Sequence, residues 1–228
     1  MRKFLILSLF VMCFGIMATS GYAQGPLGTI LKRMDDHNKS LQTLKANVTM
    51  VKTNVQLNVS DTNVGTTQYI TKIAGKGKMY VRIDWTQPVQ EQMAVIGDNY
   101  ELYRPRLGQV IYGKVQQSKG SPAVGGALAF MNMSREQLKA NYDVVYIGEE
   151  GISGGAKTWH LQLTPKTQTS YKLAELWVDG NGMPLQAKIT EQNNDTTTVL
   201  LSDLIKNQKV DTKAFALNYP NTVKKIKA

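Results

Sequence analysis

Period-two alternation of apolar and polar side chains is the feature of this sequence that most restricts its fold. Between Met79 and Trp85 every odd position is apolar, whereas the even positions are mostly polar. Side chains on a β-strand point alternately to its two faces, so this spacing predicts a strand with one buried face. Similar β-rich runs occupy residues 46–59, 65–73, 91–96, 100–103, 109–115, 143–147, 158–163, 172–178, 185–191 and 196–201.

Short turn sequences separate many of these runs. They include Gly97-Asp98-Asn99, Gly154-Gly155, Asp179-Gly180-Asn181-Gly182 and Asn193-Asn194-Asp195, whose residue types favour tight turns. Tight turns join antiparallel strands, because parallel strands need a long crossover connection. We therefore expect one antiparallel β-sheet, which must curl because an open twisted sheet of this many strands rarely stays flat.

Two helical segments interrupt the strand pattern. In residues 27–44 the apolar positions are spaced by three, four and seven, which predicts an amphipathic helix. The second segment, residues 118–141, begins with glycines and continues through an apolar stretch at 127–131. Ser134 then stands three residues before Gln137, the spacing of a capping box at the start of a helix. The expected fold class is α+β, with these helical segments covering one face of the sheet.

The apolar residues of the sheet and helices are the candidate binding residues. If the helices cover the concave face loosely, an apolar cavity remains for a ligand, whereas close packing gives an ordinary core. The pattern alone leaves both possibilities open. The candidate cavity residues are Met79, Val81, Ile83, Trp85, Trp159 and Leu161 on the sheet, Ile30, Leu31 and Met34 on the first helix, and Leu128, Phe130 and Met131 on the glycine-hinged second segment.

Residues 1–23 have the composition of a secretory signal peptide. Arg2 and Lys3 precede an apolar run at residues 4–17, and small residues stand at Gly21 and Ala23. The apolar run is too short to span a bilayer comfortably, so we expect cleavage after Ala23 and no anchor helix. Residues 24–228 would then form a single domain.

The cysteine and charge content exclude several classes of protein. Cys13, the only cysteine, lies in the leader, so the mature chain has no disulfide and no thiolate nucleophile or ligand.

Without Arg2 and Lys3 the chain has 25 basic and 17 acidic residues, a net charge of +8. The basic residues are scattered except at 224–227, a pattern that does not indicate nucleic-acid binding. A basic rim could still meet an acidic partner or an anionic membrane.

The context of the possible catalytic motifs does not support an enzyme. Residues 151–155 match the nucleophile-elbow pattern, but a strand follows them where that motif requires a helix. His37, on the polar side of the first helix, and His160, on the non-core side of a strand, have no obvious partners. No histidine pair or carboxylate cluster has the spacing of a metal site. We therefore expect no catalytic residue, no metal and no cofactor.

Two sets of motifs follow one another along the chain. The first comprises the aromatic strand and Pro88 at residues 78–88, the turn at 97–100 and Tyr103-Arg104-Pro105. The second is Leu163-Thr164-Pro165-Lys166, Asp179-Gly180-Asn181-Gly182, Glu191-Gln192-Asn193-Asn194, Val210-Asp211, Phe215 and Pro220. In this order, over residues 27–225, the chain resembles the LolA-type periplasmic carriers of outer-membrane lipoproteins.

The resemblance implies both a fold and a function. The fold is an incomplete, curled antiparallel barrel with helices lidding an apolar concave face. Such carriers are soluble, take acylated lipoproteins from an inner-membrane transporter and deliver them to an outer-membrane receptor, so the resemblance implies these three partners and a monomeric carrier. One family feature is absent: an Arg-Pro pair often precedes the first aromatic strand, where the arginine helps to hold the lid closed, and here residues 75–78 read Gly-Lys-Gly-Lys.

Two other functions remain open from the sequence. The domain could carry or sense another lipid or hydrophobic molecule. It could also be a periplasmic adaptor that binds no ligand and pairs with a partner through a sheet edge.

Overall fold

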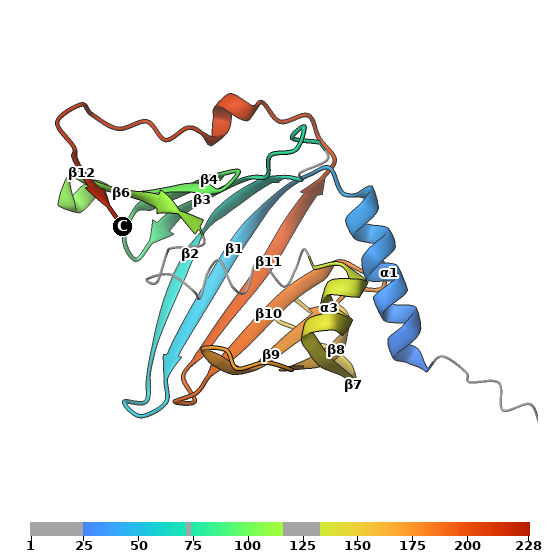
Figure 1. Cartoon of the computed structure of the whole chain (residues 1–228). Helices are drawn as coiled ribbons and strands as arrows, with labels where there is room; N and C mark the ends of the chain where they lie inside the picture. The colour runs from blue at the N-terminus through green and yellow to red at the C-terminus, as the bar shows by residue number, and fades with distance from the viewer. Residues whose placement is uncertain (1–24, 72–73, 116–132) are drawn as a thin grey trace, which may run out of the picture.

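The computed structural model describes residues 25–71, 74–115 and 133–228. These residues form one 12-stranded sheet with the strand order β12-β6-β5-β4-β3-β2-β1-β11-β10-β9-β8-β7 (Figure 1). The sheet curls strongly but does not close, so β12 and β7 remain as its two edges. The predicted α+β fold, an incomplete curled barrel, is confirmed, and two α-helices accompany the sheet within the described residues.

The strands are β1 (Thr43–Asn54), β2 (Val59–Ile70), β3 (Tyr80–Gln87), β4 (Glu91–Ile96), β5 (Asn99–Arg104), β6 (Gln109–Lys114), β7 (Tyr142–Gly151), β8 (Lys157–Pro165), β9 (Tyr171–Val178), β10 (Pro184–Glu191), β11 (Thr196–Lys206) and β12 (Lys224–Lys227). The helices are α1 (Pro26–Ser40) and α3 (Arg135–Asn141), with short 3₁₀ turns η1 (Pro105–Leu107) and η3 (Thr212–Phe215).

The sheet consists of two antiparallel meanders joined at the middle. Strands β1 to β6 follow one another in the first meander, and β7 to β11 do so in the second. Antiparallel pairing of β1 with β11 joins them, over a register that runs from Leu44 opposite Lys206 to Thr53 opposite Thr196. The one departure from the expected antiparallel sheet is β12, which pairs with β6 in parallel.

Two element boundaries differ from the sequence prediction. The first helix ends at Ser40 instead of continuing to Leu44, because Leu41 has extended backbone angles and Leu44 already pairs with Tyr69 across β1 and β2. The run at 46–59 contains a hairpin turn, in which Asn58 has a φ of 52°. Asparagine tolerates this left-handed conformation better than most residues.

The capping box predicted at Ser134 is present at the start of α3. The Ser134 hydroxyl accepts a hydrogen bond from the backbone N–H of Gln137 at 3.2 Å, and the Gln137 side chain accepts one from the backbone N–H of Ser134 at 2.9 Å. Both donors belong to the first turn of the helix, where the backbone alone cannot satisfy them.

A C-terminal strap, residues 207–223, connects β11 to β12 across the outer face of the sheet (Figure 1). The Arg82 guanidinium, on the outer face of β3, donates hydrogen bonds to the backbone carbonyls of Ala214 and Ala216 at 2.8 and 3.0 Å. Phe215 is fully buried, with its ring centroid 5.5 Å from that of Tyr80. Because of these contacts, part of the outer face is covered as well as the inner one.

Candidate functional site

The inner, concave face of the sheet is built from alternate residues that the strand register aligns. In one row, Ala46 of β1 lies opposite Thr67, which lies opposite Ile83 and then Met93. The next row brings Trp85 to the same face, opposite Gly65. The odd-numbered residues of β3 therefore point inward, as the alternation predicted.

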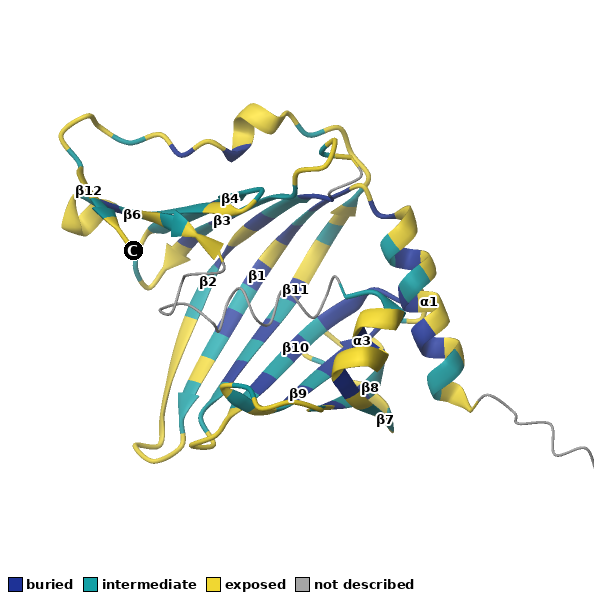
Figure 2. Cartoon of the chain, in the orientation of Figure 1, coloured by how far each residue is buried: buried dark blue, intermediate teal, exposed yellow. Residues whose placement is uncertain are grey.

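One half of the concave face is covered by helices and closely packed. Ile30, Leu31 and Met34 of α1 and Leu138 of α3 are 0–1% exposed. They belong to one hydrophobic cluster with the inward residues of β1 and β8 to β11 (Figure 2). Among the sheet residues of that cluster, Leu161 is fully buried. For this half, the structure supports the interpretation as an ordinary core.

The other half of the concave face, formed by β3 to β6, is apolar but less buried. The row that contains Ile83 and Met93 continues to Leu102 and Ile111 on neighbouring strands. The half-buried apolar residues of this half of the concave face are Val81, Met93, Val95, Tyr100, Leu102 and Ile111. Val81 and Met93 also pack against the hydrophobic cluster. We call these six residues the concave apolar surface, and it is the candidate site because it continues the core into a partly open region.

Most of the candidate cavity residues lie in or against the packed cluster, and their role in ligand binding stays a prediction. Ile83 and Trp85 are buried in the cluster, and Val81 and Trp159 pack against it. The Arg33 guanidinium of α1 lies 5.1 Å from the Trp159 ring centroid, which ties the helix to β8 through a cation–π contact. Met79 precedes β3, is half-buried and is not part of the cluster.

Leu128, Phe130 and Met131 lie outside the described residues. Their predicted role as a lid therefore remains a prediction.

Several residues of the concave face were not singled out from the sequence. Met93 lies in a run predicted as a strand, and the alternation of Met93 with Val95 could have identified both as inward-facing. Tyr69 packs against the cluster from β2. It follows a polar stretch without clear alternation, so no local signal marks its direction.

The expectation for His37 was wrong. It is 8% exposed, and its Nε2 atom is buried without a hydrogen-bond partner among the described residues. Desolvation by burial lowers the pKa of His37 below its ordinary value of 6.5, and nearby Lys206 lowers it further. The side chain therefore lies on the packed side of α1, not on its polar side.

His160 does face away from the core, but the expectation that it has no partner was also wrong. Its Nδ1 lies 2.9 Å from Glu150 and its Nε2 lies 3.1 Å from Glu175, while its ring stacks on Trp177 at 4.3 Å. Glu175 also forms an ion pair with Lys188 at 3.0 Å. The partners come from β7, β9 and β10, so the cluster links four strands on the outer face of the sheet.

Residues 25–71, 74–115 and 133–228 contain neither a metal-binding cluster nor a membrane-spanning helix. No three histidine, cysteine, aspartate or glutamate side chains gather there in a way that could hold a metal ion. Within the same ranges no helix has the length and apolar character needed to cross a membrane.

The fold has counterparts among solved structures. An uncharacterized conserved protein from Thermus thermophilus matches with a TM-score of 0.56 and 11% identity, covering 89% of this chain and 99% of that chain. The MucA/MucB complex of Pseudomonas aeruginosa gives a TM-score of 0.50 and 13% identity, covering 83% of this chain and 60% of that chain. A LolA superfamily protein from Nitrosomonas europaea gives 0.42 and 16% identity, covering 83% and 97%. With identities this low, the first two matches indicate a likeness of fold alone.

The open curled barrel, with helices over half of an apolar concave face, is the incomplete barrel that the sequence motifs predicted. A family model described as "Uncharacterized protein" matches residues 76–225, which is more than half of the chain, and the chain belongs to that family. No curated protein matches it.

Proposed function

We propose that this chain is a periplasmic carrier that binds the acyl chains of lipoproteins at the concave apolar surface. In this proposal the chain receives its cargo from an inner-membrane transporter and passes it to an outer-membrane receptor. The leader at residues 1–23 is removed, residues 24–228 act as one soluble monomeric domain, and no reaction is catalysed.

The observation that carries the proposal is the continuity of apolar side chains across the concave face. The packed cluster under α1 and α3 extends through Val81 and Met93 to the half-buried row on β5 and β6. An acyl chain lying there would bury its own surface and that of the sheet together. Each methylene removed from water contributes about 0.8 kcal/mol, so a few methylenes already give useful affinity.

The test is formation of a complex with a detergent-free triacylated lipoprotein. We expect a one-to-one complex by gel filtration and native mass spectrometry, and we expect its loss when the acyl chains are removed. Binding of free lipids without the lipoprotein would favour a carrier or sensor of another hydrophobic molecule. Binding of neither would contradict the proposal.

A matched pair of variants directs the test to the concave apolar surface. Val95→Glu places a carboxylate on the half-buried inner face, whereas Thr66→Glu places one on an exposed outward position of β2. Val95→Glu should abolish the complex while the β circular-dichroism spectrum is retained, and Thr66→Glu should bind as the parent does. Equal binding by both variants would contradict this location of the site.

One observation favours the alternative function, an adaptor that pairs with a partner through a sheet edge. The edge strand β7 exposes Val145 and Ile147, which are 49% and 52% accessible, beside a row of backbone groups that another strand could pair with. Complementation of a deletion strain separates the two functions. A carrier should lose activity with Val95→Glu and keep it with Ile147→Lys, whereas an edge-pairing adaptor should show the reverse.

A further inference from the structure

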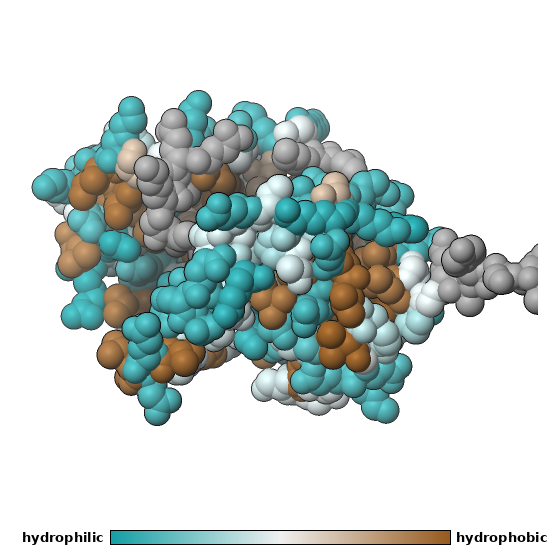
Figure 3. All heavy atoms as spheres, turned by 60° about the horizontal axis from the view of Figure 1, so that its bottom comes forward, coloured by the Kyte–Doolittle hydropathy of each residue, from teal (hydrophilic) through white to brown (hydrophobic). Residues whose placement is uncertain are grey.

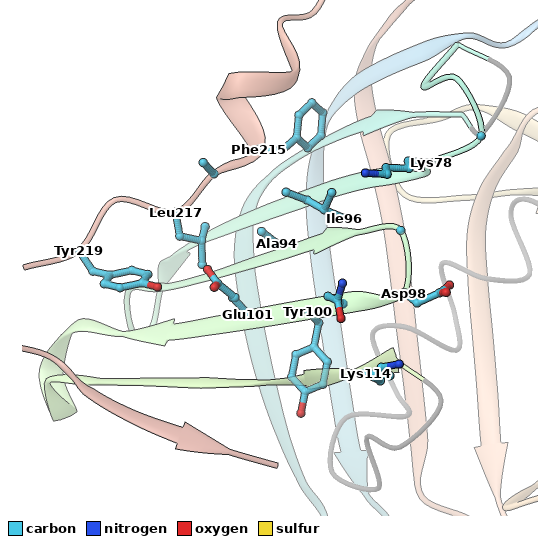
Figure 4. Close-up of a pocket in the computed structure, with 14 residues that line it drawn as sticks. Lys78, Ala94, Ile96, Asp98, Tyr100, Glu101, Lys114, Phe215, Leu217 and Tyr219 are labelled. Carbon is cyan, nitrogen blue, oxygen red and sulfur yellow. The ribbon is translucent and has the colours of Figure 1, made fainter. Parts of the chain in front are cut away.

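A pocket of about 840 Å³ lies on the outer face of the sheet, between the C-terminal strap and the β4–β5 hairpin (Figure 4). Its apolar walls are Ala94 and Ile96 on β4 and Phe215 and Leu217 on the strap. The sheet separates this pocket from the concave apolar surface, since Val95 and Ile96 are consecutive residues of one strand. Tyr100 borders both, but its ring points away from Ile96 and Phe215 (Figure 4). The pocket is therefore a second candidate site.

The pocket is assembled from segments that are far apart in the sequence. The β4–β5 pairing sets Ala94 opposite Glu101 and Ile96 opposite Asn99, which forms the floor. The strap closes one side, and its position depends on Arg82 and on buried Phe215. The volume is within the range of about 300–1,000 Å³ that small-molecule sites typically have.

The pocket has a positively charged residue at one end and a negatively charged residue at the other. Figure 4 shows the Lys78 ammonium directed towards the space between Phe215 and Ile96, while Glu101 lies at the other end, below Leu217. Among the residues that the structure describes, neither Lys78 nor Glu101 forms a hydrogen bond or an ion pair through its side chain. Asp98 and Lys114, which carry opposite charges, also line the pocket.

This arrangement favours a ligand with one anionic group and one apolar chain. An anion near Lys78 gains a cationic partner that the protein does not otherwise use, and the adjacent wall offers apolar contact. The carboxylate of Glu101 repels an anion from the opposite end, so the ligand has one preferred direction.

We propose that the outer pocket binds a single-chain anionic amphiphile, with its carboxylate or phosphate at Lys78 and its alkyl chain along Ala94, Ile96 and Leu217. This site is independent of the proposed acyl-binding surface and lies on the opposite face of the sheet. The bound chain touches the hairpin and the strap together, and it therefore holds the strap in place.

Calorimetric titration of the purified chain with decanoate, decyl phosphate and decanol, each in monomeric form, tests the charged end of the site. Lys78→Gln should weaken decanoate binding about fivefold, the size expected when an ion pair near the surface is lost, and should leave decanol binding unchanged. Lys76→Asn is the matched control, because it removes the same charge from the same loop at a residue that does not line the pocket, and asparagine suits its φ of 52°. Equal affinities in Lys78→Gln and Lys76→Asn would overturn the proposal.

Tighter binding of decyl phosphate than of decanoate would identify a phosphate as the preferred group, and the reverse order would identify a carboxylate.

The neighbouring residues Ile96 and Val95 separate this site from the concave one. Ile96→Glu should abolish decanoate binding and leave triacylated lipoprotein binding intact, whereas Val95→Glu should have the opposite pair of effects. Circular dichroism and the thermal midpoint establish that both variants are folded. If decanoate binding survives Ile96→Glu but is lost in Val95→Glu, the ligand occupies the concave surface and the outer site is refuted. Failure of lipoprotein binding in the parent would refute the carrier function alone.

Discussion

His37 is a single buried side chain that connects the stability of α1 to pH. Its Nε2 atom has no hydrogen-bond partner among the described residues, and burial is the largest cause of its lowered pKa. Lys206 acts in the same direction, while Asp179 partly opposes both. Protonation would place a poorly compensated charge beneath the helix, which is unfavourable in a desolvated position.

We predict that the protein loses stability as the pH falls through 6.5, the ordinary value for histidine. Below that pH the unfolded chain binds a proton that folded His37 does not, so the free energy of unfolding decreases until the lowered folded pKa is passed. Urea denaturation at a series of pH values measures this slope. His37→Phe should flatten it between pH 7 and the lowered pKa, and an unchanged slope would show that other groups cause it.

Gly182 allows the turn between β9 and β10 to pack closely against α1. Its φ is +87°, and a Cβ there would lie 2.2 Å from the carbonyl oxygen of Arg33 in α1. The turn between β9 and β10 thus approaches the helix backbone more closely than any side chain permits. Arg33 reinforces the contact by donating a hydrogen bond to the carbonyl of Gly180 at 2.6 Å.

We predict that Gly182→Ala destabilises the protein more than Gly154→Ala does. Gly154 has a similar φ of +90° with nothing within 4 Å of its added Cβ, so its substitution should cost only the left-handed strain of about 1–2 kcal/mol. Gly182→Ala adds a backbone clash that α1 can relieve only by moving. Equal losses in chemical denaturation would show that α1 yields freely at this contact.

At the scale of elements, α3 is the shorter of the two α-helices in the described residues, and it depends on its cap. It has seven residues, of which only Leu138 is buried, and a helix this short is marginal without tertiary contacts. The reciprocal hydrogen bonds of Ser134 and Gln137 satisfy donors at its first turn. The cap therefore determines how firmly α3 holds Leu138 against the core.

Ser134→Ala should lower the free energy of unfolding by about 1 kcal/mol, the usual loss for an N-cap of this type. Amides of α3 should exchange with solvent faster, while those of β9 and β10 should change little. Ser153→Ala, at an exposed position of the β7–β8 turn, is the control and should have no such effect. Unaltered exchange in α3 would mean that packing of Leu138 alone maintains the helix.

For the whole molecule, the sheet has cover on both faces. The helices and the core cluster occupy half of the concave face, and the strap occupies the outer face of β3 to β5 through Phe215 and Leu217 (Figure 1). Apolar side chains also remain at the surface, and Figure 3 shows them as separate groups among hydrophilic ones. Among the large hydrophobic side chains of the described residues, Leu57 at the tip of the β1–β2 hairpin is the most exposed.

Phe215→Ala should destabilise the protein by about 3–5 kcal/mol, because it removes a fully buried ring and leaves a cavity. Limited proteolysis should then cleave within residues 207–223 at a protease concentration that leaves the parent intact. Thr212→Ala, an exposed position in the same segment, should resist cleavage as the parent does. If Phe215→Ala shows the same resistance, the strap is held mainly by Arg82.

The sequence by itself determined the local features of this protein. The alternation from Val81 to Trp85 predicted which side chains face the core, and the Ser134–Gln137 spacing predicted the start of α3. These features depend on backbone geometry and on neighbours within a few residues. The ordered motifs additionally indicated the incomplete barrel.

Only the tertiary structure decided the contacts between distant segments. The pairing of β1 with β11, the parallel strand β12 and the carboxylate partners of His160 join residues that no local pattern relates. The packed and partly open halves of the concave face, and the pocket under the strap, also follow from these long-range contacts. Their free energy comes from surfaces that become neighbours only when the chain folds, so periodicity could predict that the inner face is apolar but not where it is left open.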